Sequence, residues 1–188
     1  MRNAPKPPRP ERAAYRHGHL REASIAAAFR LIAEGGEAAL SLRRVADAVG
    51  VAHRSLYNHF ADREALVDAV AEEGFGALAA ALREAATRAD FVKAYVRFVL
   101  ANPNLYRVMT GRPISVILRK ADLWRAIQLS AAESARLFGE PNADPIQNRR
   151  VVSKVLILLY GGISMYQQGL LDVGGEDELI AELQSMIP

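Results

Sequence analysis

Apolar residues recur along this chain at the spacing of α-helices, and no stretch alternates between apolar and polar as a β-strand does. In the segment 40–66, four apolar residues fall at i, i+3, i+4 and i+7: Leu42, Val45, Ala46 and Val49. Ser41 can cap this first helix, and Gly50 supplies the left-handed residue that ends it. A second helix follows with Leu56 and Phe60 facing inward. The pattern predicts two short helices joined by a tight turn.

The same spacing continues on both sides of this segment. Helices are expected over 20–34, 63–87, 90–102, 105–111, 113–137, 145–170 and 176–187, with a break at Asn102-Pro103-Asn104 and a loop at 139–145. The fold class is therefore all-α. We expect an arm at 1–17, a helix-turn-helix domain at 18–65, and a helical ligand-binding and dimerisation domain at 66–188.

The second short helix presents hydrogen-bond donors outward. With Leu56 and Phe60 toward the core, Arg54 and Asn58 lie on the opposite side, one turn apart. An Arg–Asn ridge suits base edges in a major groove, and the flanking Tyr57 and His59 suit phosphates. The alternative is an ordinary helical hairpin with a solvated polar face.

The run AAFRLIAEGGEAALSLRRVADAVGVAHRSLYNHFADREAL resembles, without a gap, the N-terminal pattern of the TetR family of transcriptional regulators. The resemblance implies that Tyr57, His59 and Arg63 contact phosphates and that Ser41 lies near the DNA backbone. Two positions depart from the family: Ala52 stands where Ser or Thr usually starts the recognition helix, and Arg54 replaces a small residue. The candidate DNA-binding residues are Ser41, Arg43, Arg44, His53, Arg54, Ser55, Tyr57, Asn58, His59 and Arg63.

The helix expected at 145–170 is apolar on nearly every side, so every side must be covered. One face can meet the core and the other a second copy of the chain, with Gly161, Gly162 and Ser164 allowing close approach. Together with 175–187, this helix predicts a homodimer through a four-helix bundle.

The C-terminal part also resembles a TetR subgroup named for a Trp-His-Gly motif. The resemblance rests on YxHGxLR at Tyr15–Arg21, on YVRFVLANPNLYRVMTG and on the penultimate helix. Of the motif itself only Gly161 is present, with Leu156 and Tyr160 at the other two positions.

The family resemblance implies a repressor that leaves its operator DNA when a small-molecule effector enters the C-terminal helices. Candidate pocket residues are Tyr95, Phe98, Tyr106, Arg107, Met109, Trp124, Gln128, Tyr160 and Tyr166. Arg107 and Gln128 would orient a largely apolar ligand, although each aromatic residue could equally be plain core. Gly74 and Gly76 inside the helix at 63–87 either soften a connector or let another helix pack closely.

Composition and charge limit which ligands and partners the protein is expected to bind. Residues 1–60 hold ten Arg and Lys against five Asp and Glu, so positive charge gathers around the helix-turn-helix segment. Arg9 or Arg12 of the arm could reach a minor groove, or the arm could be a solubilising tail. There is no cysteine, and the pair His17 and His19 lacks further ligands, so no metal or cofactor is expected.

The longest uncharged apolar run, 155–166, is too short to span a bilayer, and no apolar leader precedes the arm. We therefore expect no membrane partner and a cytoplasmic protein. No catalytic constellation stands out, so an all-α enzyme is the weakest alternative. A DNA-binding dimer without small-molecule control and a transcriptional activator remain open.

Overall fold

The structure, a computed structural model, describes residues 19–187, which contain ten α-helices, one short 3-10 helix and no strand. The elements are α1 (Leu20–Gly35), η2 (Glu37–Ala39), α2 (Leu42–Val49), α3 (His53–Leu56), α4 (Arg63–Arg83), α5 (Arg88–Ala101), α6 (Pro103–Thr110), α7 (Ile114–Ile117), α8 (Ala121–Phe138), α9 (Pro145–Gln167) and α10 (Glu176–Met186). The all-α prediction is confirmed. The arm expected at 1–17 lies outside the described residues.

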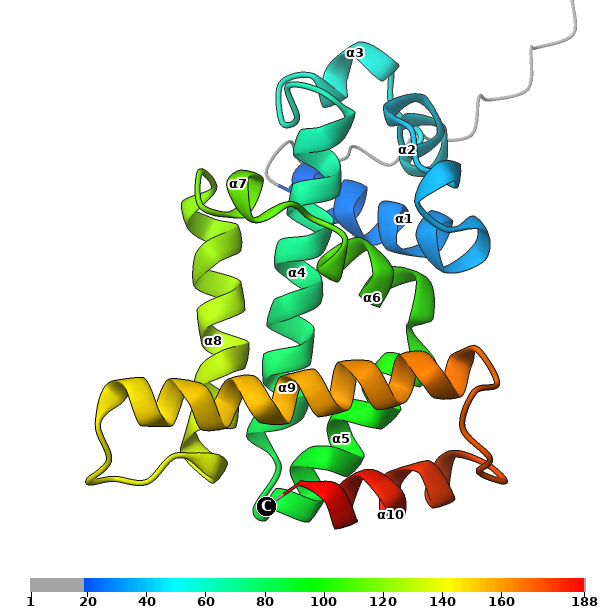
Figure 1. Ribbon diagram of the computed structural model, residues 1–188. Coiled ribbons are helices and arrows are strands. Elements are labelled where there is room, and N and C mark those ends of the chain that lie inside the picture. Colours follow the sequence, from blue (N-terminus) through cyan, green and yellow to red (C-terminus); the bar gives the residue numbers. More distant parts are fainter. Residues whose placement is uncertain (1–18, 188) are drawn as a thin grey trace, which may run out of the picture.

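The helices form two groups that share the long helix α4 (Figure 1). α1, α2 and α3 gather at one end, where α4 begins, and α8 runs beside α4 toward the other end. α9 crosses in front of α4 and α8, and α10 packs against α5 and α9. The boundary expected between residues 65 and 66 falls inside α4, so the two groups are joined by continuous helix.

Local signals build the turn between α2 and α3. The Ser41 hydroxyl accepts a hydrogen bond from the Arg44 backbone N–H at 3.2 Å, which caps α2. Gly50 ends the helix with φ 72° and ψ 30°, a left-handed conformation that glycine adopts without steric cost. Leu56 and Phe60 are buried as expected.

The second helix of the motif is shorter than the sequence pattern predicts. α3 covers only His53–Leu56, and residues 57–59 form turns, although the Phe60 N–H still donates to the Leu56 carbonyl at 2.9 Å. Its first turn has no side-chain cap, because Ala52 at the N-cap carries no acceptor.

The corner after α4 also differs from the expected boundaries. α4 ends at Arg83, and α5 begins at Arg88 with Thr87 as its N-cap. Thr87 and Asp90 form a capping box, in which hydrogen bonds from Thr87 lower the pKa of the Asp90 carboxyl. Asp90 is therefore the third residue of α5 and not its start.

The two glycines of α4 have different surroundings. A Cβ on Gly74 would lie 2.8 Å from Sδ and 2.9 Å from Cγ of Met109, so the bare backbone there lets α6 pack closely. A Cβ on Gly76 would meet nothing within 4 Å. For Gly74, the structure favours close packing over a softened connector.

Candidate nucleic-acid interface and ligand pocket

The outward side of α3 and of the turn after it carries five exposed polar residues: His53, Arg54, Tyr57, Asn58 and His59. They lie at the tip of the molecule farthest from α9 and α10 (Figure 1). The Tyr57 side chain is 50% exposed, and its ring meets His53 edge-on with centroids 5.2 Å apart. Ser55 is half-buried. Cationic, amide, phenolic and imidazole donors therefore share one short protruding segment, as contact with a DNA groove requires.

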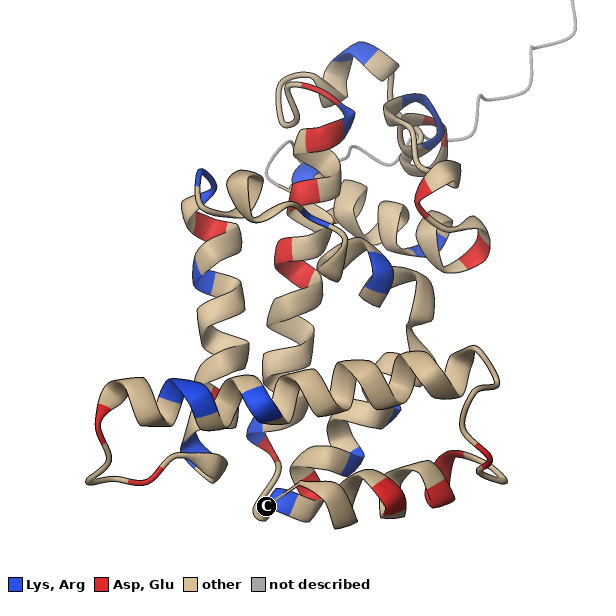
Figure 2. Ribbon diagram, viewed as in Figure 1, with Lys and Arg blue, Asp and Glu red and all other residues tan. Residues whose placement is uncertain are grey.

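The candidate residues of α2 divide between solvent and the fold. Arg43 is exposed on α2. Arg44 is exposed too, but its Nη1 donates to the Ala39 carbonyl at 2.8 Å. The Ser41 hydroxyl caps α2 from within the same turn. Figure 2 shows the basic positions of this end over α2 and α3.

Arg63, for which the family resemblance implies a phosphate contact, is held by the protein itself. Its Nε donates to the Leu40 carbonyl at 3.1 Å and its Nη2 to the Glu37 carbonyl at 2.8 Å. Its Nη1 lies 3.2 Å from the Glu37 carboxylate and 2.9 Å from the Glu64 carboxylate. The guanidinium therefore fastens the start of α4 to the segment that precedes α2. Its contact with phosphate stays a prediction.

A chain of ionic contacts continues from Glu64 into the second group of helices. Arg112, in the segment between α6 and α7, lies 2.9 Å from the Glu64 carboxylate and 2.6 Å from that of Asp68. The Arg112 and Asp68 side chains are only 9% and 10% exposed. Hydrogen bonding from Arg112 is the main reason that the pKa of Glu64 lies below its usual value. Sequence reasoning missed this cluster; a signal was Asp68 among the apolar positions of α4.

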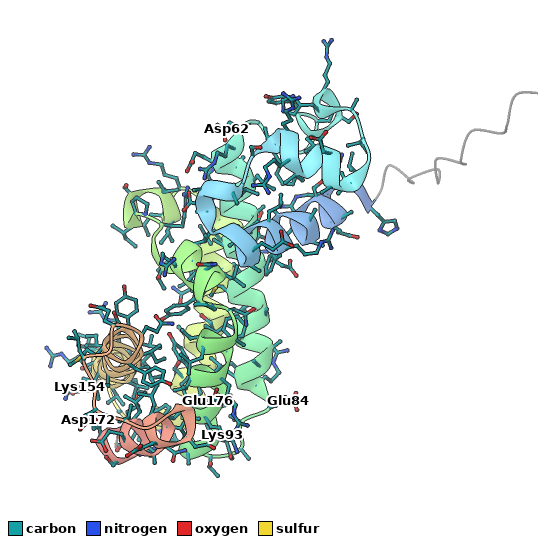
Figure 3. All side chains as sticks on the ribbon, turned by 90° about the vertical axis from the view of Figure 1, so that its right-hand side faces the viewer. Asp62, Glu84, Lys93, Lys154, Asp172 and Glu176 are labelled. Carbon is teal, nitrogen blue, oxygen red and sulfur yellow. The ribbon has the colours of Figure 1, made fainter. Side chains whose placement is uncertain are left out.

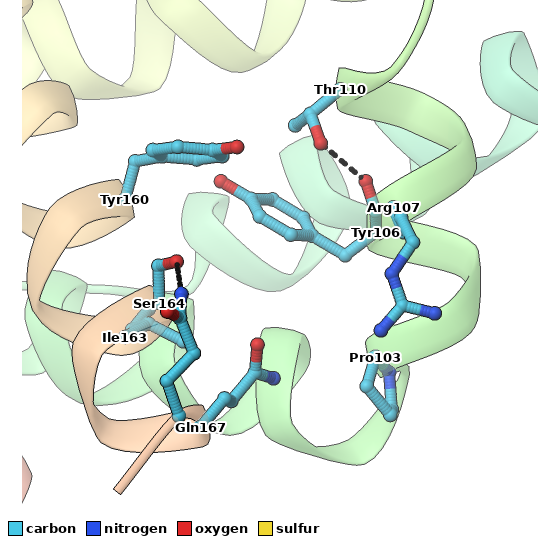
Figure 4. A pocket seen from close by; sticks show the side chains of 9 residues that line it. Pro103, Tyr106, Arg107, Thr110, Tyr160, Ile163, Ser164 and Gln167 are labelled. Carbon is cyan, nitrogen blue, oxygen red and sulfur yellow. Dashed lines mark hydrogen bonds between the residues drawn. The ribbon is translucent and has the colours of Figure 1, made fainter. Parts of the chain in front are cut away.

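A cavity of about 250 Å³ opens between α6 and α9 (Figure 4). Its lining consists of Pro103, Tyr106, Arg107, Thr110, Tyr160, Ile163, Ser164, Gln167 and Gln168. Tyr106, Arg107 and Tyr160 are among the candidate pocket residues, and the other six were missed. Four of them carry hydroxyl or amide side chains that look like ordinary surface, whereas Pro103 looks like a helix breaker and Ile163 like plain core. Side chains with polar groups dominate this lining, in contrast to the apolar lining expected.

Behind the cavity, Tyr95 and Tyr106 share a hydrogen bond between their hydroxyl groups at 2.7 Å. Burial raises the pKa of both phenols, that of Tyr95 far above its ordinary value. The pair therefore stays neutral and forms a fixed floor beneath the cavity.

The other candidate pocket residues lie outside this cavity. Met109 is buried against Gly74, and Phe98 and Tyr166 pack on the core half-buried. Trp124 and Gln128 are on the exposed side of α8. Aromatic character did not distinguish between these environments.

The outer face of α9 carries large apolar side chains in solvent. Ile157 is 69% exposed and Tyr160 is 52% exposed, and Figure 3 shows α9 and α10 together on one side of the molecule. Gly161 faces open space, but Gly162 does not, since a Cβ there would lie 2.5 Å from Leu183 of α10. Gly162 therefore serves packing within the chain, and of the two glycines only Gly161 is open to a partner helix.

Residues 19–187 offer neither a membrane-spanning helix nor a cluster of metal ligands. No helix there combines the length and apolar character needed to cross a membrane. No group of three His, Cys, Asp or Glu side chains in that range is placed to hold a metal ion.

Comparison with known proteins places these features in a family. The model of the family described as bacterial regulatory proteins, tetR family, matches residues 25–70, which include α2, α3 and the start of α4. No curated protein sequence matches the chain.

Solved structures share the whole fold. A protein of unknown function from Rhodococcus sp. RHA1 is 29% identical, with a TM-score of 0.76 over 93% of this chain and 96% of that one. A TetR family protein from Vibrio parahaemolyticus is 23% identical, with a TM-score of 0.58 over 88% and 95%. The fatty acid degradation regulator FadR from Bacillus halodurans is 17% identical, with a TM-score of 0.64 over 89% and 93%. Residues 25–70 are therefore a helix-turn-helix domain of the tetR type, and the chain as a whole shares the all-helical fold of these solved structures.

Proposed function

We propose that the chain is a homodimeric repressor that binds operator DNA through α3 and leaves it when a small molecule enters the cavity between α6 and α9. The observation that carries the proposal is the protruding donor surface of α3, which no other part of the described chain covers. In this proposal the protein acts on operator DNA in the cytoplasm. Its role is regulation and not catalysis.

The exposed residues of α3 and its following turn divide into two kinds of contact. Arg54 and Asn58 are assigned to base edges, because Arg pairs with guanine and Asn with adenine in the major groove. Tyr57 and His59 are assigned to phosphates, which fix orientation without reading sequence. Arg63 is assigned a positioning role through its bonds to Glu37 and Leu40.

The homodimer is supported by apolar exposure and by charge. α9 exposes four large apolar side chains, those of Ile146, Ile157, Tyr160 and Met165, and grouped apolar exposure of this kind marks an interaction surface. The first half of α9 is basic and the start of α10 is acidic, and they lie at opposite ends of this layer (Figure 2). A twofold axis across the layer would place the basic half of one protomer over the acidic end of the other.

Release by a ligand needs a physical connection between the cavity and the DNA-binding helices. α6 lines the cavity and, two residues after its last residue Thr110, supplies Arg112 to the cluster with Glu64 and Asp68. Glu64 in turn contacts Arg63, which fastens the segment before α2. A ligand that favours a displaced α6 would shift the population toward protomers whose α3 helices are wrongly spaced for the groove.

Two variants of this function differ in regulation. A DNA-binding dimer without small-molecule control has no need of a polar cavity beside α6, so the cavity favours the ligand-responsive form. An activator would share all of these contacts, and transcription measurements would separate it from a repressor.

The test is a fluorescence-anisotropy titration of the purified protein with duplex DNA from just upstream of its own gene, at two salt concentrations. We expect binding that prefers this DNA over a scrambled duplex and that weakens steeply with salt. Arg54→Ala and Asn58→Ala should change the preference between sequences by about 1–3 kcal/mol, whereas Tyr57→Phe should weaken binding to every duplex alike. Equal binding to both duplexes would contradict the proposal, and a uniform loss in all three variants would contradict the base assignments.

A further inference from the structure

The cavity between α6 and α9 carries charge of one sign. Among its nine lining residues Arg107 is the only charged one, and Asp and Glu are absent from the lining. The neighbouring polar groups are neutral hydroxyls and amides, among them those of Tyr160 and Gln167 (Figure 4). A ligand held here meets one cation and several neutral hydrogen-bonding groups, which suits a single negative charge.

The Arg107 guanidinium keeps hydrogen-bond donors available for a ligand. Its Nη1 donates to the Asn104 side-chain carbonyl at 3.1 Å, and no carboxylate of the described residues lies within ion-pair distance of it. The guanidinium is exposed at the cavity. Guanidinium groups bind carboxylates through two parallel hydrogen bonds, which are shorter and stronger than bonds between neutral groups.

The residue that holds Arg107 also touches the DNA-binding helices. The Asn104 side-chain amide donates to the Ala33 carbonyl of α1 at 3.1 Å. A short path of hydrogen bonds therefore runs from the cavity through Arg107 and Asn104 to the last turn of α1. It is separate from the ionic path through Arg112.

Size and shape narrow the ligand further. A volume of about 250 Å³ is below the roughly 300–1,000 Å³ of pockets for drug-sized molecules, so the ligand is small. The rings of Tyr106 and Tyr160, with centroids 6.2 Å apart, and the side chain of Ile163 supply the apolar surface. These rings are too close to hold a third ring between them, so an apolar body would pack along their edges.

We infer that the effector is a small organic carboxylate of about the size of benzoate, with Arg107 as the residue that binds its carboxylate. The carboxylate would bind the nitrogen donors of Arg107 that Asn104 does not use, and the path through Asn104 to α1 would connect the bound ligand with the DNA-binding helices. The inference rests on the proposed function, because it identifies the chemical class of that function's effector.

Calorimetric titration of the full chain with benzoate and with benzamide tests the inference, since the two probes share their shape and differ in charge. We expect benzoate to bind with a dissociation constant at least about tenfold lower than that of benzamide. Arg107→Met should remove most of this preference, and Arg107→Lys should keep part of it. Arg125→Met is the matched control, because Arg125 is an exposed arginine of α8 outside the cavity.

Equal affinity for the two probes would overturn the inference, as would undiminished benzoate binding by Arg107→Met. So would the absence of binding, up to about 1 mM, by benzoate, 4-hydroxybenzoate and hexanoate alike. The same samples are titrated with the upstream DNA. A protein that binds this DNA but ignores carboxylates overturns only the ligand class, whereas a protein that binds neither overturns the proposed function.

Discussion

Replacing Arg63 by alanine separates a positioning role from a phosphate contact. The structure gives its guanidinium four partners inside the protein, and two of them are the backbone carbonyls of Glu37 and Leu40 just before α2. Without these bonds the start of α2 is fastened to α4 less firmly. We therefore expect Arg63→Ala to lower both the stability of the fold and the affinity for DNA.

The size of the effect follows from the exposure of the group. A well-formed hydrogen bond from a charged group contributes about 1.5–3 kcal/mol, and a surface ion pair about 0–1 kcal/mol. The Arg63 side chain is 38% exposed, so water replaces part of what is lost. A loss of about 1–2 kcal/mol in the free energy of unfolding is expected. For a chain of 188 residues this lowers the melting temperature by about 2–8 °C.

Two measurements on the same variant distinguish the roles. Differential scanning calorimetry gives the melting temperature, and DNA titrations at several salt concentrations give the slope of log K against log salt. A lost phosphate contact reduces this slope by about one for each protomer, whereas a lost positioning contact leaves it unchanged. Arg43→Ala is the control, because Arg43 is an exposed arginine of α2 and a candidate DNA-binding residue without a role in fastening α4. An Arg63→Ala protein with unchanged melting temperature and a reduced slope would refute the reasoning.

Other substitutions test the packing, the interface and the ionic cluster. In a denaturant titration, Gly76→Ala should raise the free energy of unfolding by about 0.5–1 kcal/mol. Gly74→Ala should have a free energy of unfolding about 1–3 kcal/mol lower than that of Gly76→Ala, because the new Cβ meets Met109. Equal gains for the two variants would contradict close packing at Gly74. Ile157→Glu should give a monomer in sedimentation that keeps the helical circular-dichroism spectrum, and a persistent dimer would exclude this face. Arg112→Met should lower the free energy of unfolding by about 2–4 kcal/mol, because the Asp68 carboxylate loses its guanidinium partner. Adding Asp68→Asn to this variant should restore at least half of the loss. A double variant whose loss equals the sum of the two single losses would contradict the pairing.

The helix-turn-helix could be predicted from the sequence because the residues that form it interact over short distances along the chain. The cap at Ser41, the left-handed Gly50 and the buried pair Leu56 and Phe60 all act within a few residues. The length of α3 was overestimated, because the apolar spacing continues to Phe60 while the capping acceptor at Ala52 is missing. Thr87 and Asp90, three positions apart, have the residue types of a capping box, and this pattern in the sequence indicates the correct start of α5.

Contacts between distant segments could not be predicted in this way. Arg63 meets Glu37 from 26 positions away, and Arg112 meets Glu64 from 48 positions away. Residue type gives each of these side chains a charge but no partner. The same limit applied to the ligand pocket, where aromatic side chains alone did not show which would line a cavity.

Footprinting of the protein on the DNA upstream of its own gene, combined with the mass of the complex, tests the central claim most directly. The account predicts two protected half-sites, their centres one helical turn of about 34 Å or a multiple of it apart, with two or a multiple of two protomers on the duplex. A single protected site with one protomer, or protection spread evenly along the duplex, would contradict it.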